Sequence, residues 1–394
     1  MSAMRPVAPP RAPKPFGYVP LGDGTVARRD PLFTQGHDRV APGSLGGWLE
    51  GRLVALTPLH VGTGTFERTA RLLPALAAET PLLYPLVRMG NVPIVPGTTL
   101  KGALRAVAEA ITASCLTVRG QATRLLPPPL HTLRPCTRRD ALCPACRLFG
   151  GQGYLGRVRV ADAPLVEGST AIAHAPQRYA PRAGRGAPPP GRRFYGHGRP
   201  ATGTVPIEVA PEGCAFAWRI DFANLQPAEL GLLLIALGQG EPPLRFKLGG
   251  YKPACLGSAE FSVTALTVDD PATRYLSYVT DAGATPAPVQ RAAEPAPHEP
   301  EAAEADLDRA EPEPADADPD RAEPDFGGAE ADQSGPESSD AALTGDPVRA
   351  ATGGALASYV QTAVESGMVL ADRVERLAGI LRYPSGRDCP GEGY

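Results

Sequence analysis

The sequence lacks any run of about 18 apolar residues, so we expect no membrane-spanning helix. Its basic, Pro-rich beginning has no apolar core of a signal peptide, so we expect no secretion and a cytoplasmic protein. A Gly-Lys-Ser/Thr phosphate loop is also missing. We find neither a nucleophile triad nor paired carboxylates. These absences leave few signs of a catalytic centre.

Glycine and proline, by contrast, are abundant, with 44 and 46 residues among 394. Much of the chain should therefore be loop or linker, although 43% hydrophobic residues suffice for one or two packed domains. The small net charge of -3 hides a division, because residues 294–346 carry 18 Asp/Glu and 2 Arg. A basic body with an acidic tether suits a nucleic-acid-binding protein, and it equally suits a solvated surface with a solubilising tail.

Seven cysteines are an odd number, and their clustering favours a metal site in a reducing compartment over a disulfide framework. Cys143 and Cys146 have the spacing of one edge of a tetrahedral site. One histidine and three cysteines would close a structural zinc site with no open position. The predicted Zn²⁺ ligands are His131, Cys136, Cys143 and Cys146. The alternative is a pair of unliganded buried thiols. We expect ordinary thiols at the other four positions, Cys115, Cys214, Cys255 and Cys389.

Hydrophobic periodicity predicts strands at 51–61, 156–163, 214–222 and 259–268, and helices from 98 or 99 to about 113 and at 227–237. This order is the split βαβ pattern. We therefore predict an α+β protein with a ferredoxin-like (RRM-type) βαββαβ core and large loop insertions. Arg157 and Arg159 should share one face of their strand.

Composition predicts four regions. Residues 1–50 form a Pro/Arg-rich extension, with an extended piece near 16–21, and residues 51–284 form the core domain with its zinc loop at 131–146. Residues 285–350 form a disordered acidic linker, because Ala, Pro, Glu and Asp dominate. Residues 351–394 form a C-terminal helical segment. Its helix should run over about 356–381, dock back onto the body, and break near Gly367.

Five segments, taken together and in their order along the chain, indicate a protein family. They are HVGTG at 60–64, PGTTLKGALR at 96–105, CPACRLFG at 143–150, GRVRVADA at 156–163 and LGGYKPACLG at 248–257. Together they resemble the RAMP superfamily of CRISPR-associated proteins. FGYVPL at 16–21, followed by His37 and Asp38, is similar to the opening of a group related to backbone subunits of type III-D complexes.

The resemblance implies a guide-RNA-binding subunit of a type III interference complex in antiviral defence. Its partners would be CRISPR guide RNA, target RNA and other RAMP subunits. We expect no association with a membrane. Some members cut the target with an acidic residue after the first strand. Here 62–96 contains no Asp, only Glu67 and Glu79, so that residue is not evident. The alternatives are an endoribonuclease, processing the guide or cutting the target, and a zinc-stabilised assembly adaptor.

Several residue patterns suit an RNA backbone. Lys101 and Arg105 lie four apart and share a helix face, and 97–99 offers backbone N–H groups at a helix start. Glycines in 248–257 let backbone approach a ligand, and Tyr251 can stack on a base. The alternatives are solvated cations and a tight turn. The predicted RNA-binding residues are Lys101, Arg105, Arg157, Arg159, Lys247, Gly249, Gly250, Tyr251 and Lys252.

No catalytic residue is assigned. His60, at the end of a predicted strand, is a weak candidate for a general base, as are His37 and Asp38, and a strand-end histidine is more often structural. The segment 178–199 mixes arginines with aromatic residues, which suits either single-stranded RNA or a neighbouring protein. The candidate residues in this segment, besides its arginines, are Tyr179, Phe194, Tyr195 and His197.

Overall fold

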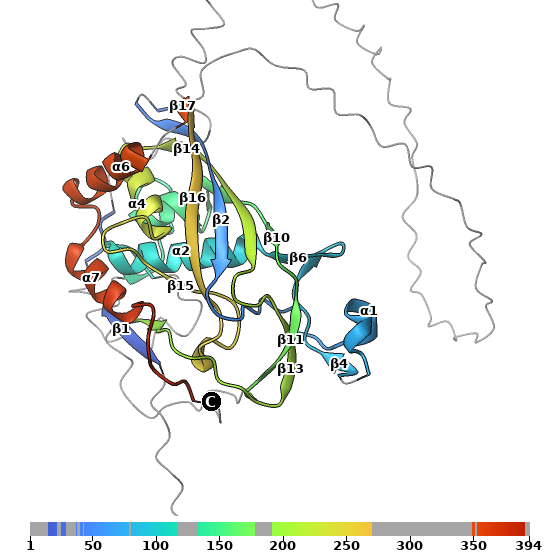
Figure 1. The fold of residues 1–394 in the computed structure, drawn as a ribbon. Coiled ribbons are helices and arrows are strands. Elements are labelled where there is room, and N and C mark those ends of the chain that lie inside the picture. Colours follow the sequence, from blue (N-terminus) through green and yellow to red (C-terminus); the bar gives the residue numbers. More distant parts are fainter. Residues whose placement is uncertain are drawn as a thin grey trace, which may run out of the picture. The chain divides into compact units, whose positions relative to one another are not determined.

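A computed structural model describes residues 15–21, 25–28, 37, 40–41, 43–78, 80–116, 133–177, 191–269, 349–350 and 353–390. Its centre is an antiparallel, curled sheet of nine strands (Figure 1). Seven strands follow one another in the order β15-β16-β2-β14-β10-β6-β5, while β17 pairs with β16 and β9 with β14. The strands are β2 (Leu45–Ala55), β5 (Arg88–Met89), β6 (Val92–Val95), β9 (Val158–Val160), β10 (Ala163–Glu167), β14 (Ala215–Leu225), β15 (Phe246–Lys247), β16 (Ser258–Asp269) and β17 (Arg349–Ala350).

Two helices, α2 (Gly97–Ile111) and α4 (Pro227–Ala236), connect the central strands. Helix α2 follows β2 and precedes β10, and strand β14 lies between those two in the sheet. Helix α4 connects β14 with β16, and β2 lies between them. The predicted mixed α+β class and the predicted order of elements are thus confirmed.

Some boundaries differ from the predictions. Strand β2 begins at Leu45 and ends at Ala55, whereas the sequence pattern placed it at 51–61. The predicted strand at 156–163 is divided into β9 and the start of β10. The extended piece near 16–21 is strand β1 (Phe16–Pro20), which pairs with β12 (Gly191–Tyr195).

Helix α2 forms because its apolar residues recur on one face. Leu100, Leu104, Val107 and Ile111 are all at most 2% exposed and belong to the main core. Burial of each such side chain stabilises the fold by about 1.5–3 kcal/mol. Ala103, predicted on the same stripe, is only half-buried and packs at the edge of this core.

The C-terminal segment packs onto the core, as predicted. Helices α6 (Gly353–Glu365) and α7 (Ala371–Ile380) are separated near Gly367, whose φ is +67°. Helix α6 lies against α4, where a Cβ on Gly231 would come within 2.0 Å of the Tyr359 carbonyl oxygen. The Leu370 N–H bonds to the Ile111 carbonyl at 2.8 Å, which ties α7 to the end of α2. Val364, predicted on the inner face, is exposed instead.

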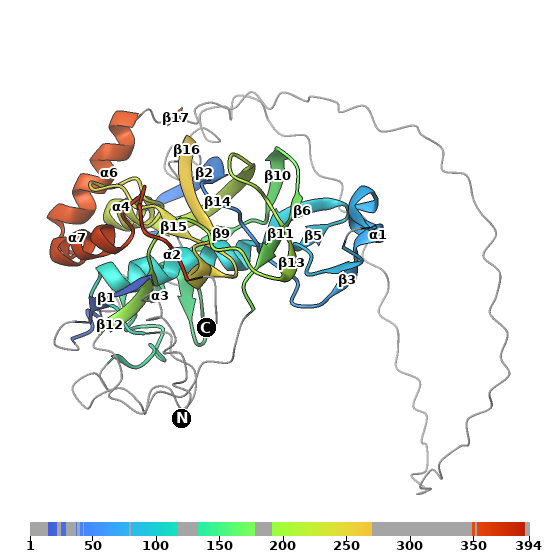
Figure 2. The same ribbon diagram turned by 60° about the horizontal axis from the view of Figure 1, so that its bottom comes forward.

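Smaller elements surround this core, as a second view shows (Figure 2). They are β3 (Glu67–Arg68), α1 (Thr69–Leu72), η2 (Pro74–Leu76), β4 (Leu82–Leu83), α3 (Pro144–Phe149), β7 (Gly150–Gly151), β8 (Tyr154–Leu155), β11 (Ala171–Ala175), β13 (Val205–Val209) and η5 (Lys252–Ala254). Strand β11 pairs with β13, β3 with β4 and β7 with β8, each antiparallel. The acidic segment 294–346 lies outside the described residues. None of the helices described has the length and apolar character needed to cross a bilayer.

Candidate RNA interface and cysteine cluster

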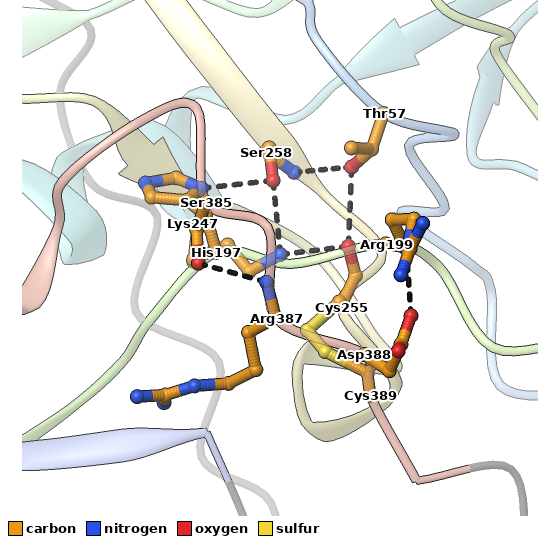
Figure 3. The surroundings of a disulfide bond; sticks show 10 residues. All are labelled: Thr57, His197, Arg199, Lys247, Cys255, Ser258, Ser385, Arg387, Asp388 and Cys389. Carbon is orange, nitrogen blue, oxygen red and sulfur yellow. Dashed lines mark hydrogen bonds and ion pairs between the residues drawn. A yellow bond between two sulfur atoms is a disulfide. The ribbon is translucent and has the colours of Figure 1, made fainter.

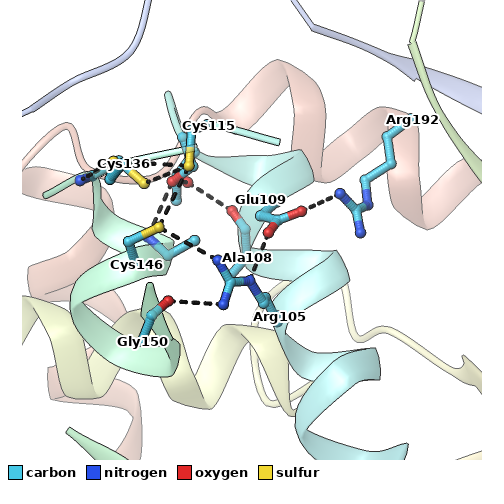
Figure 4. Close-up of polar contacts among 12 residues, drawn as sticks. Arg105, Ala108, Glu109, Cys115, Cys136, Cys146, Gly150 and Arg192 are labelled. Atoms are coloured by element: carbon cyan, nitrogen blue, oxygen red, sulfur yellow. Dashed lines mark hydrogen bonds and ion pairs between the residues drawn. The ribbon is translucent and has the colours of Figure 1, made fainter. Parts of the chain in front are cut away.

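Four buried cysteines converge beside helix α2, and Figure 4 labels three of them, Cys115, Cys136 and Cys146. Their sulfur atoms lie within 4.8 Å of one another. Three of the distances are 3.4 Å between Cys115 and Cys146, 3.6 Å between Cys143 and Cys115, and 3.8 Å between Cys136 and Cys115. Tetrahedral zinc with Zn–S bonds of about 2.3 Å would separate its sulfur ligands by about 3.8 Å. The cluster therefore has the size and donor set for a metal ion such as zinc.

The cluster corrects the predicted ligand set. Cys136, Cys143 and Cys146 take part as expected, but Cys115 is the fourth member, where the sequence suggested an ordinary thiol. His131, the fourth ligand predicted from the sequence, lies outside the described residues. Cys115 follows the end of α2, and α3 carries Cys146, so the packing of these two helices brings their thiols together. The hydrogen bond with Cys115 lowers the pKa of the Cys143 thiol.

An arginine and a buried carboxylate form the next layer around the cluster (Figure 4). The Arg105 guanidinium donates to Cys146 Sγ at 3.4 Å, to the Gly150 carbonyl at 2.8 Å and to Glu109 Oε1 at 2.7 Å. Glu109 also forms an ion pair with Arg192 of β12. Arg105, predicted to bind RNA, is therefore placed where it can stabilise the negative charge of metal-bound thiolates.

A groove of about 300 Å³ lies at the start of α2. It is where three of the sequence segments named above meet. HVGTG contributes His60, Gly62 and Gly64, the start of α2 contributes Thr99, and the glycine-rich loop contributes Gly249, Gly250 and Lys252. The full lining is His60, Val61, Gly62, Gly64, Tyr84, Thr99, Gly249, Gly250 and Lys252. Within the described part of the chain, the lining contains no acidic residue.

Backbone contacts position the glycine-rich loop in this groove. The Gly250 N–H donates to the His60 carbonyl at 2.8 Å. Gly249 has a φ of +70°, and a Cβ there would lie 2.1 Å from the same carbonyl oxygen. Only glycine fits at that approach. The imidazole of His60 is buried, and its Nδ1 is hydrogen-bonded to the Glu208 carbonyl at 2.7 Å.

The start of α2 differs from the predicted anion site. The Gly97 N–H donates to Asp162 Oδ1 at 2.7 Å, and the Thr99 N–H donates to the Pro96 carbonyl at 2.8 Å. A carboxylate of the protein thus already occupies the position that the sequence suggested for a phosphate.

Three predicted RNA-binding side chains are buried. Arg157 is 4% exposed and its guanidinium contacts Glu229 and the Asn224 carbonyl, so it does not share a surface with Arg159, which is exposed. Lys247 donates to the Cys255 carbonyl at 2.8 Å and to Ser258 Oγ at 3.0 Å. Tyr251 packs in a small core cluster with Ile207, Val209, Ala254 and Leu256. Arg157 and Tyr251 are therefore not at an open surface, whereas Lys247, although buried, also lines a small hollow; RNA binding by these three residues stays a prediction.

The remaining predicted residues are open to solvent in varying degree. Lys101 and Lys252 are partly exposed. Burial, followed by the charge of Arg105, lowers the pKa of Lys101. His37 is exposed, and its Nε2 is hydrogen-bonded to the Leu155 carbonyl at 2.7 Å. Asp38 and Tyr179 lie outside the described residues, whereas His197 is buried.

A disulfide joins Cys255, in the glycine-rich loop, to Cys389 after α7 (Figure 3). Both were expected to be ordinary thiols, so this pairing is a second correction. The neighbouring Arg199 and Asp388 form an ion pair at 2.6 Å, and the Arg199 N–H donates to the Arg387 carbonyl at 2.8 Å. The C-terminal segment is therefore fastened to the loop that lines the groove.

A comparison with models of protein families matches residues 52–253 to the RAMP superfamily. The matched region is more than half of the chain, and it includes the groove, the cysteine cluster, the end of β2 and strands β5, β6, β9, β10, β14 and β15 of the central sheet. The chain belongs to the RAMP superfamily. Membership implies a CRISPR-associated role that involves RNA and protein-complex partners. No curated protein sequence matches this RAMP chain.

One lining residue of the groove, Tyr84, lies outside the segments that the sequence pointed to. The ring of Phe66 lies 3.8 Å from the Tyr84 ring, measured between centroids. Phe66 is 54% exposed. The sequence did offer one signal for an aromatic group near the groove. Phe66 follows the glycine-rich HVGTG segment, with only Thr65 between them.

Proposed function

We propose that this RAMP protein is a guide-RNA-binding subunit of a type III CRISPR interference complex, related to the backbone subunits of type III-D complexes. One observation carries the proposal: the HVGTG segment, the start of α2 and the glycine-rich loop form one groove whose lining has no acidic residue among the described residues. Backbone approach at glycine and a lysine suit phosphates without reading bases.

The fold supports the same proposal. Strand order β16-β2-β14-β10 with α2 and α4 as connections is the arrangement expected of a ferredoxin-like, RRM-type core. In our proposal the groove lies beside this core, with Lys252 on a phosphate and the Phe66–Tyr84 pair as a platform for a base. Stacking of a base on an aromatic ring contributes about 1–3 kcal/mol. Lys101 and Arg159 are further candidates for phosphate contacts.

We propose a structural role for zinc in the cysteine cluster. Four thiolates close the coordination sphere and leave no position for a catalytic water. The ion would join the end of α2 to α3 and to the loop that carries Cys136.

Contacts with other RAMP subunits are also part of the proposal. Exposed large apolar side chains are concentrated in the connection between β2 and α2. Besides Phe66, which we assign to RNA, they are Leu76, Leu82, Met89 and Val92. Exposed apolar groups in such a concentration favour contact with a partner protein.

The rival function is an endoribonuclease, and the position of His60 in the groove is the observation that favours it. Incubation of labelled repeat RNA with the protein, with and without EDTA, separates the two. Cleavage that is lost in His60→Ala would replace our proposal by the nuclease. A zinc-stabilised adaptor would instead bind partner proteins after nuclease treatment and retain no RNA.

A pair of glycine variants tests the groove. Gly249→Ala places a Cβ against the His60 carbonyl, whereas Gly213→Ala, also at positive φ (+88°), meets nothing within 4 Å. We expect Gly249→Ala to weaken binding of a fluorescent repeat RNA at least tenfold, and Gly213→Ala to bind like the wild type. Equal affinities in the two variants would refute the groove as the RNA site. RNA recovered with the purified protein should be enriched in repeat-derived guides.

A further inference from the structure

A second, smaller hollow lies further along α2. Its volume is about 150 Å³, and we call it the cation pocket. Helix α2 forms one wall, strand β12 another, and β15 with the glycine-rich loop a third. The lining is Ala103, Ala106, Val107, Arg192, Arg193, Phe194, Tyr195, Phe246, Lys247, Lys252 and Leu381.

The pocket is strongly positive. Four of its lining residues are cationic, and none is acidic. The Glu109 carboxylate pairs with Arg192 and is shared with Arg105, so its single charge is divided between two guanidinium groups. The lining thus carries more positive charge than the neighbouring carboxylate can balance.

Lys247 forms part of the buried side of the pocket. Its ammonium group donates to the Cys255 carbonyl and to Ser258 Oγ, both neutral acceptors (Figure 3). Burial, followed by the charge of Lys252, lowers the pKa of Lys247 to about 7. An anion between the two lysines would stabilise both of their charged forms.

At the open side, Arg193 is exposed. Its guanidinium carbon lies 5.6 Å from the centre of the Phe16 ring and 5.3 Å from that of Tyr195. These rings hold the guanidinium plane in place, and its edge can still donate hydrogen bonds.

The cation pocket and the groove share Lys252. Thr99 in the groove and Ala103 in the pocket lie four residues apart on α2, about 6 Å along the helix axis. Ala103 and Ala106 are small, which leaves the space between α2 and β12 open. An RNA strand that runs along α2 from the groove would therefore reach the cation pocket next.

We propose that the cation pocket binds a phosphate group of the RNA strand whose neighbouring nucleotide occupies the groove. The volume supports a phosphate, since pockets that enclose whole small molecules measure about 300–1,000 Å³. Two lysines and two arginines match its charge and its several acceptor oxygens. This inference rests on the proposed function and extends it to a second subsite.

Filling the pocket tests the inference without removing a buried charge. Ala106→Met places an unbranched side chain in the pocket, and Gly102→Ala is the matched control, because Gly102 lies on the same helix with nothing within 4 Å of its Cβ position. Arg193→Gln removes an exposed cation of the pocket, and Arg52→Gln removes an exposed arginine outside it. Binding of a fluorescent repeat RNA is titrated at several salt concentrations.

We expect Ala106→Met and Arg193→Gln each to lower RNA affinity roughly fivefold at 0.1 M salt, with the salt slope reduced by about 0.7 for one lost contact. The two controls should match the wild type. If both pocket variants bind as their controls do while Gly249→Ala loses binding, the cation pocket is refuted and the proposed function stands.

Inorganic phosphate provides a second probe. It distinguishes a site for free phosphate from a site for a phosphate group of bound RNA. The melting temperature is measured with and without millimolar phosphate. A rise that Ala106→Met abolishes, in a protein that binds no RNA, would identify a site for free phosphate and overturn the RNA path. RNA binding that phosphate weakens in the wild type but not in Ala106→Met supports the inference.

Discussion

Replacing Cys115 by serine removes the sulfur atom that contacts all three other thiols of the cysteine cluster. A serine hydroxyl stays protonated near neutral pH and is a poor zinc ligand. Apparent binding free energies of structural zinc are about 10–16 kcal/mol, so one of four equivalent ligands contributes roughly 2.5–4 kcal/mol. We expect zinc affinity to fall about 100- to 1,000-fold.

Since metal binding stabilises the folded state, Cys115→Ser should also lower the melting temperature, by roughly 5 to 15 °C. Zinc per chain is measured by mass spectrometry of the metal after dialysis against a weak chelator. The wild type should keep one equivalent and Cys115→Ser less than half. Cys214→Ser is the control, because Cys214 is also buried but lies outside the cluster.

His131→Ala distinguishes this ligand set from the one predicted from the sequence. With four cysteines as ligands, His131→Ala should retain a full equivalent of zinc. The opposite pattern, in which His131→Ala loses zinc and Cys115→Ser retains it, would refute the four-cysteine ligand set.

Three further changes have defined outcomes. Arg105→Gln should weaken zinc binding about tenfold, because it removes a hydrogen-bond partner of a ligand sulfur. Competition with a chromogenic chelator measures the zinc affinity. An unchanged affinity would contradict the contact between Arg105 and Cys146. Cys389→Ser should destabilise the oxidised protein by at most about 5 kcal/mol, from a loop closed over a sequence separation of 134, and melts with reductant should remove the difference from wild type. Burial lowers the pKa of Lys247 to about 7 from its usual 10.5, so the unfolded chain binds more protons between these values. Stability should therefore rise between pH 7 and 9, by at most about 2 kcal/mol, and Lys247→Met should show a flatter profile in denaturant titrations.

Local patterns were enough to predict most of the core elements. The apolar stripe of α2, the continuous apolar run of α4 and the alternation in β14 and β16 are properties of short segments, and they specify helix or strand before any long-range contact forms. Gly367 could be recognised as a break because glycine readily adopts the positive φ it has there. The Cys143–Cys146 spacing likewise predicted two ligands on one short segment.

Charge and residue type alone, however, did not predict which cations face solvent. Arg157 lies one residue before β9 and is buried against Glu229, which is 72 residues away in the sequence. Lys247 is buried for a similar reason, since the turn of the glycine-rich loop places the Cys255 carbonyl above it. An arginine or lysine in the sequence has the same charge whether its partner is a carboxylate or water, and only packing decides between them.

The sequence by itself determined the helices of the core, the approximate positions of its strands, the order of these elements, the family resemblance and three of the four cysteines of the cluster. Only the tertiary structure decided that Cys115 completes the cluster, that Asp162 occupies the start of α2, and that Cys255 pairs with Cys389. The physical reason is the same in each case. Secondary structure follows from interactions between residues a few positions apart, whereas these partners are 21 to 134 residues apart and meet only when the sheet and helices pack.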